Sequence, residues 1–143
     1  MTNAIVSKTI FIKASRETVW TFLVDKDRLG DWYHPAKRDL TLGEDYALVE
    51  KGGTLEKCVI WGRVLEMKPP ERLVTTFNIA PFNGAETVVT WLLQEVAGGS
   101  RLTLTHEGIA EASGDSAMEM LEFLEKGWES HLQCMWQAVT KLD

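Results

Sequence analysis

The C-terminal segment of the chain, from Ser116 onward, has the residue spacing of one long amphipathic helix. Apolar side chains recur there every three or four residues, at Ala117, Leu121, Leu124, Trp128, Leu132, Met135 and Val139. Ser116 followed by Glu119 is a capping-box pattern and predicts where this helix begins. A long helix with one apolar stripe must bury that stripe against another layer, which restricts the folds open to the chain.

The N-terminal part predicts a strand followed by two short helices. The segment "AIVSKTIFIKA" alternates as a strand does, and Ser15 is placed to cap a helix over "SRETVWTFLVD". Asp25 is placed to cap a second helix that ends near Gly30. Pro35 makes further helix unfavourable, because the residue before a proline avoids helical backbone angles.

The middle of the chain predicts an antiparallel meander. Strand patterns occur in "DYALVEKGGTLEKCVIWGRVLEM", "RLVTTFNI", "ETVVTWLLQEV" and "RLTLTHEGI". Gly52-Gly53, Pro69-Pro70, Asn83-Gly84 and "AGGS" separate them, and such short connections favour antiparallel neighbours. The order of elements predicts one α+β domain over residues 1–143, in which the last helix covers the apolar face of the sheet. In the strand Glu56–Met67, the pattern does not decide which pair lies on that face, Ile60 and Val64 or Trp61 and Leu65.

Composition restricts the classes of binding partner and the cellular compartment that we expect for the protein. A formal net charge of -6 and the absence of a basic run argue against nucleic acid and anionic membranes as partners. The N-terminus does not resemble a signal peptide, and no segment is long and apolar enough to span a bilayer, so no membrane insertion is expected. Cys58 and Cys134 form no metal-binding or redox pattern, which favours a cytoplasmic protein with two buried, reduced thiols.

Two residues stand out as candidates for function. In "RLTLTHEG", strand alternation places His106 on the same face as Leu102 and Leu104. This imidazole is either a packed, hydrogen-bonded side chain or a polar group in a pocket. Gly127 interrupts the long helix at a cost of about 1 kcal/mol relative to alanine. It serves either close packing against the sheet, or a mild kink, or space for a ligand beside Trp128.

No metal site or cofactor is expected from the sequence. His34, His106 and His131 are far apart in the chain and do not form the helical pair typical of metal sites. Whether they meet in space is left open by the sequence.

Four segments in order resemble the SRPBCC (START/Bet v 1-like) superfamily, and within it the AHSA1-like branch. They are "ASRETVWTFLVDKDRLGDWY", "WGRVLEMKPPERLVTTF", "VTWLLQEVAGGSRLTLTHEG" and "KGWESHL". The resemblance implies a helix-grip fold: a curved antiparallel sheet wrapped around a long C-terminal helix, with two short helices after the first strand. It also implies a deep cavity for hydrophobic molecules, with the motif residues Trp32, His106 and Trp128 around it. The chain resembles only the C-terminal domain of the eukaryotic Hsp90 activators.

Three functions follow as hypotheses. The first is binding of a small hydrophobic ligand between sheet and helix, without catalysis. Its expected site comprises Trp32, Tyr33, Phe77, Trp91, Leu104, His106, Phe123, Leu124, Gly127 and Trp128. The second is an enzyme of the cyclase, aromatase or hydrolase kind that uses His106 as its acid or base. The third is an interaction module for an Hsp90-type chaperone or a stress-response partner. A homodimer is also left open.

Overall fold

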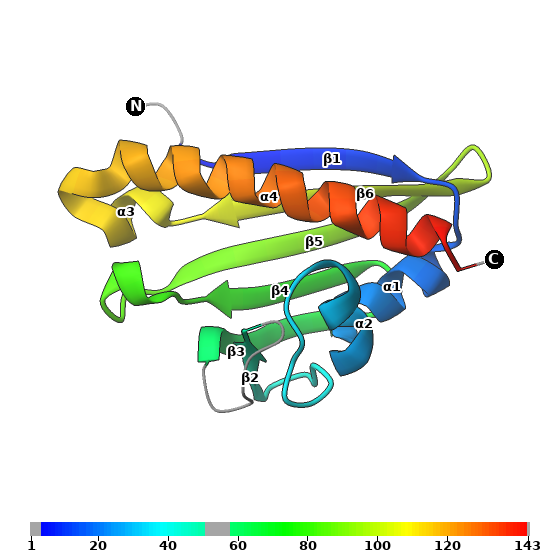
Figure 1. Ribbon diagram of the computed structural model, residues 1–143, viewed down its shortest axis with the longest axis horizontal. Helices are drawn as coiled ribbons and strands as arrows, with labels where there is room; N and C mark the ends of the chain where they lie inside the picture. The colour runs from blue at the N-terminus through cyan, green and yellow to red at the C-terminus, as the bar shows by residue number, and fades with distance from the viewer. Residues whose placement is uncertain (1–3, 51–57, 143) are drawn as a thin grey trace.

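A computed structural model describes residues 4–50 and 58–142 of the chain. The described residues form one antiparallel sheet of six strands in the order β1-β6-β5-β4-β3-β2 (Figure 1). The strands are β1 (Val6–Ile12), β2 (Asp45–Val49), β3 (Cys58–Lys68), β4 (Arg72–Phe77), β5 (Thr87–Val96) and β6 (Gly99–Glu107). The α-helices are α1 (Arg16–Val24), α2 (Lys26–Trp32), α3 (Ile109–Ser113) and α4 (Ala117–Thr140), and Ala80–Phe82 and Gly114–Ser116 form 3-10 turns. This arrangement confirms the predicted α+β helix-grip fold.

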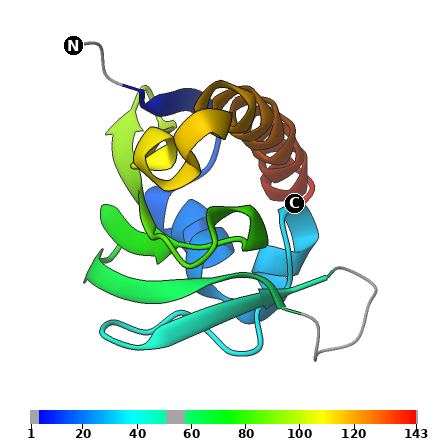
Figure 2. The same cartoon turned by 90° about the vertical axis from the view of Figure 1, so that its left-hand side faces the viewer.

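The sheet curves around the side on which the long helix lies. Figure 2 shows β1 beside α4 and the sheet turning away from it toward β3 and β2. α4 packs against β1 and also contacts α1 and α2. Its buried residues are Leu124, Trp128, Leu132, Met135 and Val139, which confirms this part of the predicted stripe. No helix in the described residues combines the length and the hydrophobicity that a bilayer span needs.

Strand alternation determines which side chains face α4. Leu102, Leu104 and His106 are all fully buried, as the parity of β6 predicts. The open question about β3 is also answered, since Ile60 and Val64 are buried. Trp61 and Leu65, on the opposite face of this strand, are 36% and 50% exposed.

The two short helices begin as predicted, but α2 ends later. The Ser15 hydroxyl accepts a hydrogen bond from the backbone N–H of Thr18 at 3.1 Å and caps α1. α2 follows at Lys26 with Asp25 at its N-cap position, although the Asp25 side chain makes no capping hydrogen bond. The helix passes Gly30 and ends at Trp32, because the restriction that Pro35 imposes acts on the residue directly before it.

The start of α4 differs from the predicted capping box. The Ser116 side chain makes no capping hydrogen bond, and its backbone angles of −95° and 14° lie outside the extended region typical of a cap. The reason is the segment before it. α3 and the 3-10 turn Gly114–Ser116 lead directly into α4, so its first residue continues a helical path.

Two of the predicted turns, Asn83-Gly84 and Gly52-Gly53, have different outcomes. Asn83 and Gly84 have positive φ angles of 53° and 89°, but they follow a 3-10 turn in a longer connection between β4 and β5. The Gly52-Gly53 turn lies outside the described residues.

The prediction of two buried thiols is wrong for Cys134, which is exposed because it lies on the outer face of α4, whereas Cys58 is half-buried.

Candidate functional site

His106 is the centre of a hydrogen-bonded chain that links α4 to three strands. The Trp128 indole donates from Nε1 to His106 Nδ1 at 3.0 Å. His106 Nε2 lies 2.8 Å from the Thr87 hydroxyl, which itself donates to the Phe77 carbonyl at 2.7 Å. Because Nδ1 accepts and the Thr87 proton is already donated, only the tautomer with its hydrogen on Nε2 satisfies all three bonds.

The His106 imidazole is uncharged at neutral pH. Burial lowers the pKa of His106 from its ordinary value of 6.5 to about 3. Both ring nitrogens are occupied within the protein, so the side chain has no lone pair or N–H left for a substrate. The His106 side chain instead holds the Trp128 ring in one orientation against the sheet.

Aromatic rings fill most of the space around Trp128. The Trp128 ring meets Trp91 edge-on at 5.5 Å between ring centroids, and it lies 5.3 Å from Tyr33 and 5.9 Å from Phe77. Trp32 stacks on Tyr33 at 4.9 Å and donates from its indole N–H to the Phe22 carbonyl at 2.8 Å. Offset and edge-on contacts of this kind are the favourable geometries for aromatic pairs.

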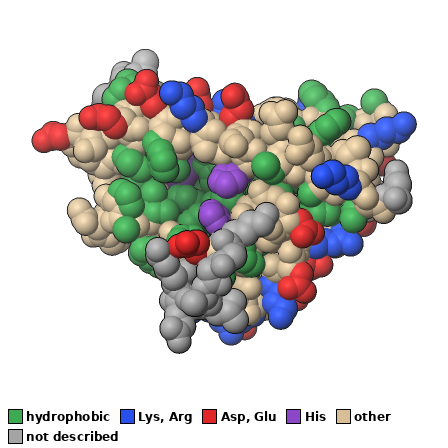
Figure 3. Space-filling model, in the orientation of Figure 1, with side chains coloured by type: hydrophobic (Ala, Val, Ile, Leu, Met, Phe, Trp, Pro, Cys, Tyr) green, Lys and Arg blue, Asp and Glu red, His purple; other side chains and the backbone are tan. Residues whose placement is uncertain are grey.

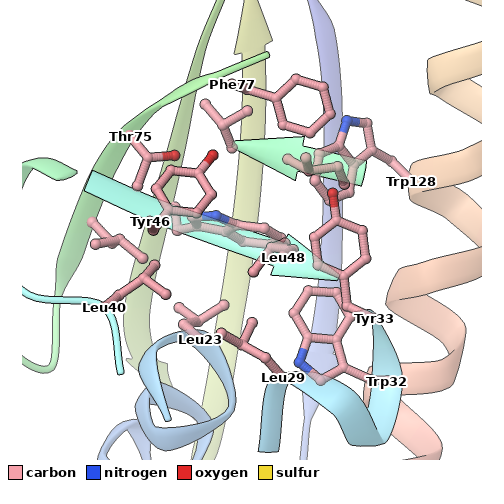
Figure 4. Close-up of a pocket in the computed structure, with 14 residues that line it drawn as sticks. Leu23, Leu29, Trp32, Tyr33, Leu40, Tyr46, Leu48, Thr75, Phe77 and Trp128 are labelled. Atoms are coloured by element: carbon pink, nitrogen blue, oxygen red, sulfur yellow. The ribbon is translucent and has the colours of Figure 1, made fainter. Parts of the chain in front are cut away.

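We call the space enclosed by these rings the inner cavity (Figure 4). Its lining residues are Leu23, Leu29, Trp32, Tyr33, Leu40, Tyr46, Leu48, Ile60, Leu73, Thr75, Phe77, Val89, Trp91 and Trp128. Its volume is only about 30 Å³. That is close to the share of one water molecule in the liquid. The deep hollow that the resemblance implied is therefore not present there, because indole, phenol and leucine side chains occupy the volume.

A larger opening lies between α4 and the sheet, and we call it the mouth pocket. Its volume is about 160 Å³, and it is lined by Tyr33, Ile60, Phe77, Ile79, Phe123, Leu124, Gly127, Trp128 and His131. Figure 3 shows a hydrophobic area with histidine side chains at its edge on this face of the molecule. Tyr33, Ile60, Phe77 and Trp128 belong to both linings, so the mouth pocket continues the wall of the inner cavity.

Gly127 faces open space in the mouth pocket. A Cβ atom built at this position would meet no atom within 4 Å, outside its chain neighbours and the backbone of its own helix. The reading of Gly127 as a close-packing residue is therefore wrong. The absence of a side chain instead leaves room beside Trp128, on the wall of the pocket.

Tyr33 brings a polar group to this apolar wall. Its side chain is buried, with 9% of its surface exposed, and its hydroxyl points in among the pocket side chains (Figure 4). None of the hydrogen bonds between described residues involves this hydroxyl, and it is not one of the polar atoms that are buried away from solvent without a partner. Burial raises the pKa of Tyr33 well above its ordinary value, so the phenol keeps its proton.

Two histidines that the sequence did not assign to the site lie at its edge. The His131 ring packs edge-on against Tyr33 at 4.6 Å, and the His34 ring lies 5.6 Å from His131. Burial, and then the neighbouring His34, lower the pKa of His131. A signal was present, since His34 directly follows Tyr33, and His131 is one helical turn from Gly127 and Trp128.

The ten predicted site residues divide into two groups. Eight of them line the inner cavity or the mouth pocket: Trp32, Tyr33, Phe77, Trp91, Phe123, Leu124, Gly127 and Trp128. Leu104 and His106 line neither and are fully buried behind the wall. Across residues 4–50 and 58–142, no three His, Cys, Asp or Glu side chains are grouped so that they could hold a metal ion.

Known structures share this architecture. Protein MLL2253 from Mesorhizobium loti aligns with a TM-score of 0.82 at 19% identity, covering 97% of this chain and 98% of that chain. CalU16 from Micromonospora echinospora aligns with a TM-score of 0.72 at 23% identity, covering 96% and 75%. The Aha1 dimer from Colwellia psychrerythraea aligns with a TM-score of 0.76 at 18% identity, covering 94% and 95%. At these identities, the likeness establishes the fold alone.

The curved sheet closed by a long C-terminal helix defines a helix-grip protein of the SRPBCC type. The sequence matches the family described as activator of Hsp90 ATPase homolog 1-like protein over residues 13–140. The chain therefore belongs to the AHSA1-like family. No curated protein sequence matches it.

Proposed function

We propose that the protein binds a small hydrophobic molecule in the mouth pocket, between α4 and the sheet. The observation that carries this proposal is an apolar, largely aromatic pocket of about 160 Å³ with open space at Gly127. Apolar pockets with a few polar groups are the usual form of small-molecule sites. The SRPBCC resemblance supports the same reading, because it implies a ligand cavity on this side of the helix.

Catalysis by His106 has less support than binding. The imidazole is fully buried, and both of its nitrogens are engaged by Trp128 and Thr87. An acid or base must reach the proton that it transfers, either directly or through one water. A homodimer and a chaperone partner both stay predictions for this chain, although the Colwellia relative was solved as a dimer.

Titration with benzene, followed by NMR of the backbone and indole N–H signals, tests the proposal. We expect the Gly127 amide and the Trp128 indole signals to shift in a saturable way. Gly127→Leu should abolish these shifts, because its side chain would occupy the pocket. Ser130→Leu is the matched control, since Ser130 is an exposed residue of the same helix outside the pocket lining. The absence of shifts, or shifts that persist in Gly127→Leu, would contradict the proposal.

Two phenylalanines provide a second, independent comparison. Phe123 and Phe11 are each 63% exposed, but only Phe123 lines the mouth pocket. Phe123→Ala should weaken benzene binding roughly 3- to 10-fold, because about 1 kcal/mol of apolar contact is lost. Phe11→Ala should leave the affinity unchanged. Equal effects of the two substitutions would place the ligand elsewhere.

A further inference from the structure

Tyr33 brings a hydroxyl group to the wall that the mouth pocket shares with the inner cavity. This hydroxyl takes part in no hydrogen bond among the described residues, and it is not one of the polar atoms that are buried away from solvent without a partner. A ligand that covered this hydroxyl would shut it off from water, and the hydroxyl would then be left unpaired at an energetic cost unless an oxygen of the ligand bonded to it. The Tyr33 hydroxyl can donate to a carbonyl, and it can donate to or accept from a ligand hydroxyl.

The described residues that line the inner cavity and the mouth pocket offer no lysine or arginine to hold an acid. The basic side chain in the mouth pocket is His131, and burial lowers its pKa from the ordinary value of 6.5, which keeps it neutral near pH 7.5. An anionic ligand would lose its hydration without gaining an opposite charge. The ligand should therefore be uncharged.

The volume of the mouth pocket limits the size of the ligand. An apolar protein cavity of about 150 Å³ is known to accommodate benzene. The mouth pocket, at about 160 Å³, is of the same size. The rings of Phe77 and Trp128 in its wall also offer faces and edges suited to a flat partner.

We propose that the mouth pocket selects uncharged, single-ring aromatic compounds that carry one carbonyl or hydroxyl oxygen, which hydrogen-bonds to the Tyr33 hydroxyl. This inference rests on the proposed function and specifies its ligand class. It assigns to Tyr33 the recognition of the polar end and to Gly127 the space for the ring.

A comparison of acetophenone with ethylbenzene isolates the oxygen, because the two differ mainly in the carbonyl group. Both would be titrated into the wild type and into Tyr33→Phe by NMR at pH 7.5. The ratio of the Kd of ethylbenzene to that of acetophenone should fall roughly 3- to 10-fold in Tyr33→Phe, the effect of one lost neutral hydrogen bond. The two compounds differ in hydrophobicity, but this difference affects the ratio equally in the wild type and in the variant, so it cancels when the two ratios are compared.

Tyr46→Phe is the matched control. Tyr46 is also a buried tyrosine, but its hydroxyl donates to the Thr76 carbonyl at 2.6 Å. It lines the inner cavity and does not line the mouth pocket. Its replacement should leave the Kd ratio unchanged. Benzoate, an anion of similar size, should bind the wild type at least about 10-fold more weakly than acetophenone at pH 7.5.

The outcomes separate this inference from the function on which it rests. If both neutral compounds bind, Gly127→Leu blocks them, and Tyr33→Phe leaves the Kd ratio unchanged, ligand binding stands and the role of Tyr33 is overturned. If benzoate binds as tightly as acetophenone, the preference for uncharged ligands is overturned. If neither neutral compound binds the wild type, the proposed function itself fails, and the ligand class fails with it.

Discussion

Acidification should destabilise the protein through His106. The native state holds this imidazole neutral with a pKa of about 3, whereas an unfolded chain has the ordinary value of 6.5. Between these values, the unfolded state binds a proton that the native state excludes. The stabilising contribution is therefore fully present above pH 6.5, and it is lost progressively as the pH falls from 6.5 toward 3.

The size of the effect follows from the two pKa values. Each pH unit in this window changes the free energy of unfolding by about 1.4 kcal/mol for one proton. From pH 7.5 to pH 5.0, His106 alone should lower the free energy of unfolding by about 2 kcal/mol. For a domain with an ordinary stability of about 5–15 kcal/mol, this loss is readily measured.

Urea unfolding of the wild type and of His106→Gln at both pH values measures this contribution. Glutamine offers an acceptor and a donor to Trp128 and Thr87 but does not titrate, and the other ionisable groups are the same in both proteins. The wild type should lose about 2 kcal/mol more stability than the variant between pH 7.5 and pH 5.0. Equal losses in the two proteins would refute the neutral, buried state of His106.

Three further substitutions test the space around two glycines and the hydrogen bonds of Thr87. Gly127→Ala should raise the free energy of unfolding by up to about 1 kcal/mol, and Tm by about 2–4 °C in a thermal melt, because its Cβ meets no atom within 4 Å. A lower Tm would show that the space is not open. Gly62→Ala should instead cost about 1–3 kcal/mol, because its Cβ would lie 2.3 Å from the Thr76 carbonyl oxygen, and unchanged urea unfolding would disprove that close approach. Thr87→Val should cost about 2–4 kcal/mol in the same assay, since the His106 N–H and a β4 carbonyl lose their partner. A cost below about 0.5 kcal/mol would contradict the hydrogen-bonded chain.

The sequence predicted the fold wherever local pattern and tertiary structure agree. The alternation of β6 correctly placed His106 on the inner face, and helical periodicity correctly placed Leu124, Trp128 and Leu132 in the buried stripe. The capping box at Ser116 failed for a tertiary reason. The chain enters α4 from a preceding short helix, which the sequence pattern does not predict.

The site was harder to predict than the fold. Helical spacing placed Trp128 on the buried face, and the family resemblance placed Trp32, next to Tyr33, at a cavity, but neither showed that these rings nearly fill the interior. Volume depends on how side chains from α2, α4 and the sheet interlock, and no single segment carries that information. The proximity of His34 and His131 is likewise a long-range contact, formed where the end of α2 meets α4.

The order of strands in the sheet has a consequence for synthesis on the ribosome. Of the six strands of this sheet, β1 is made before the others, yet its partner is β6, which is made after the other five. The strands β2 to β5 pair with their neighbours in sequence and can assemble as the chain grows. β1 is an edge strand and must wait without any strand partner until residues 99–107 have emerged. The pairing of β1 in the sheet is thus delayed until β6 has been made.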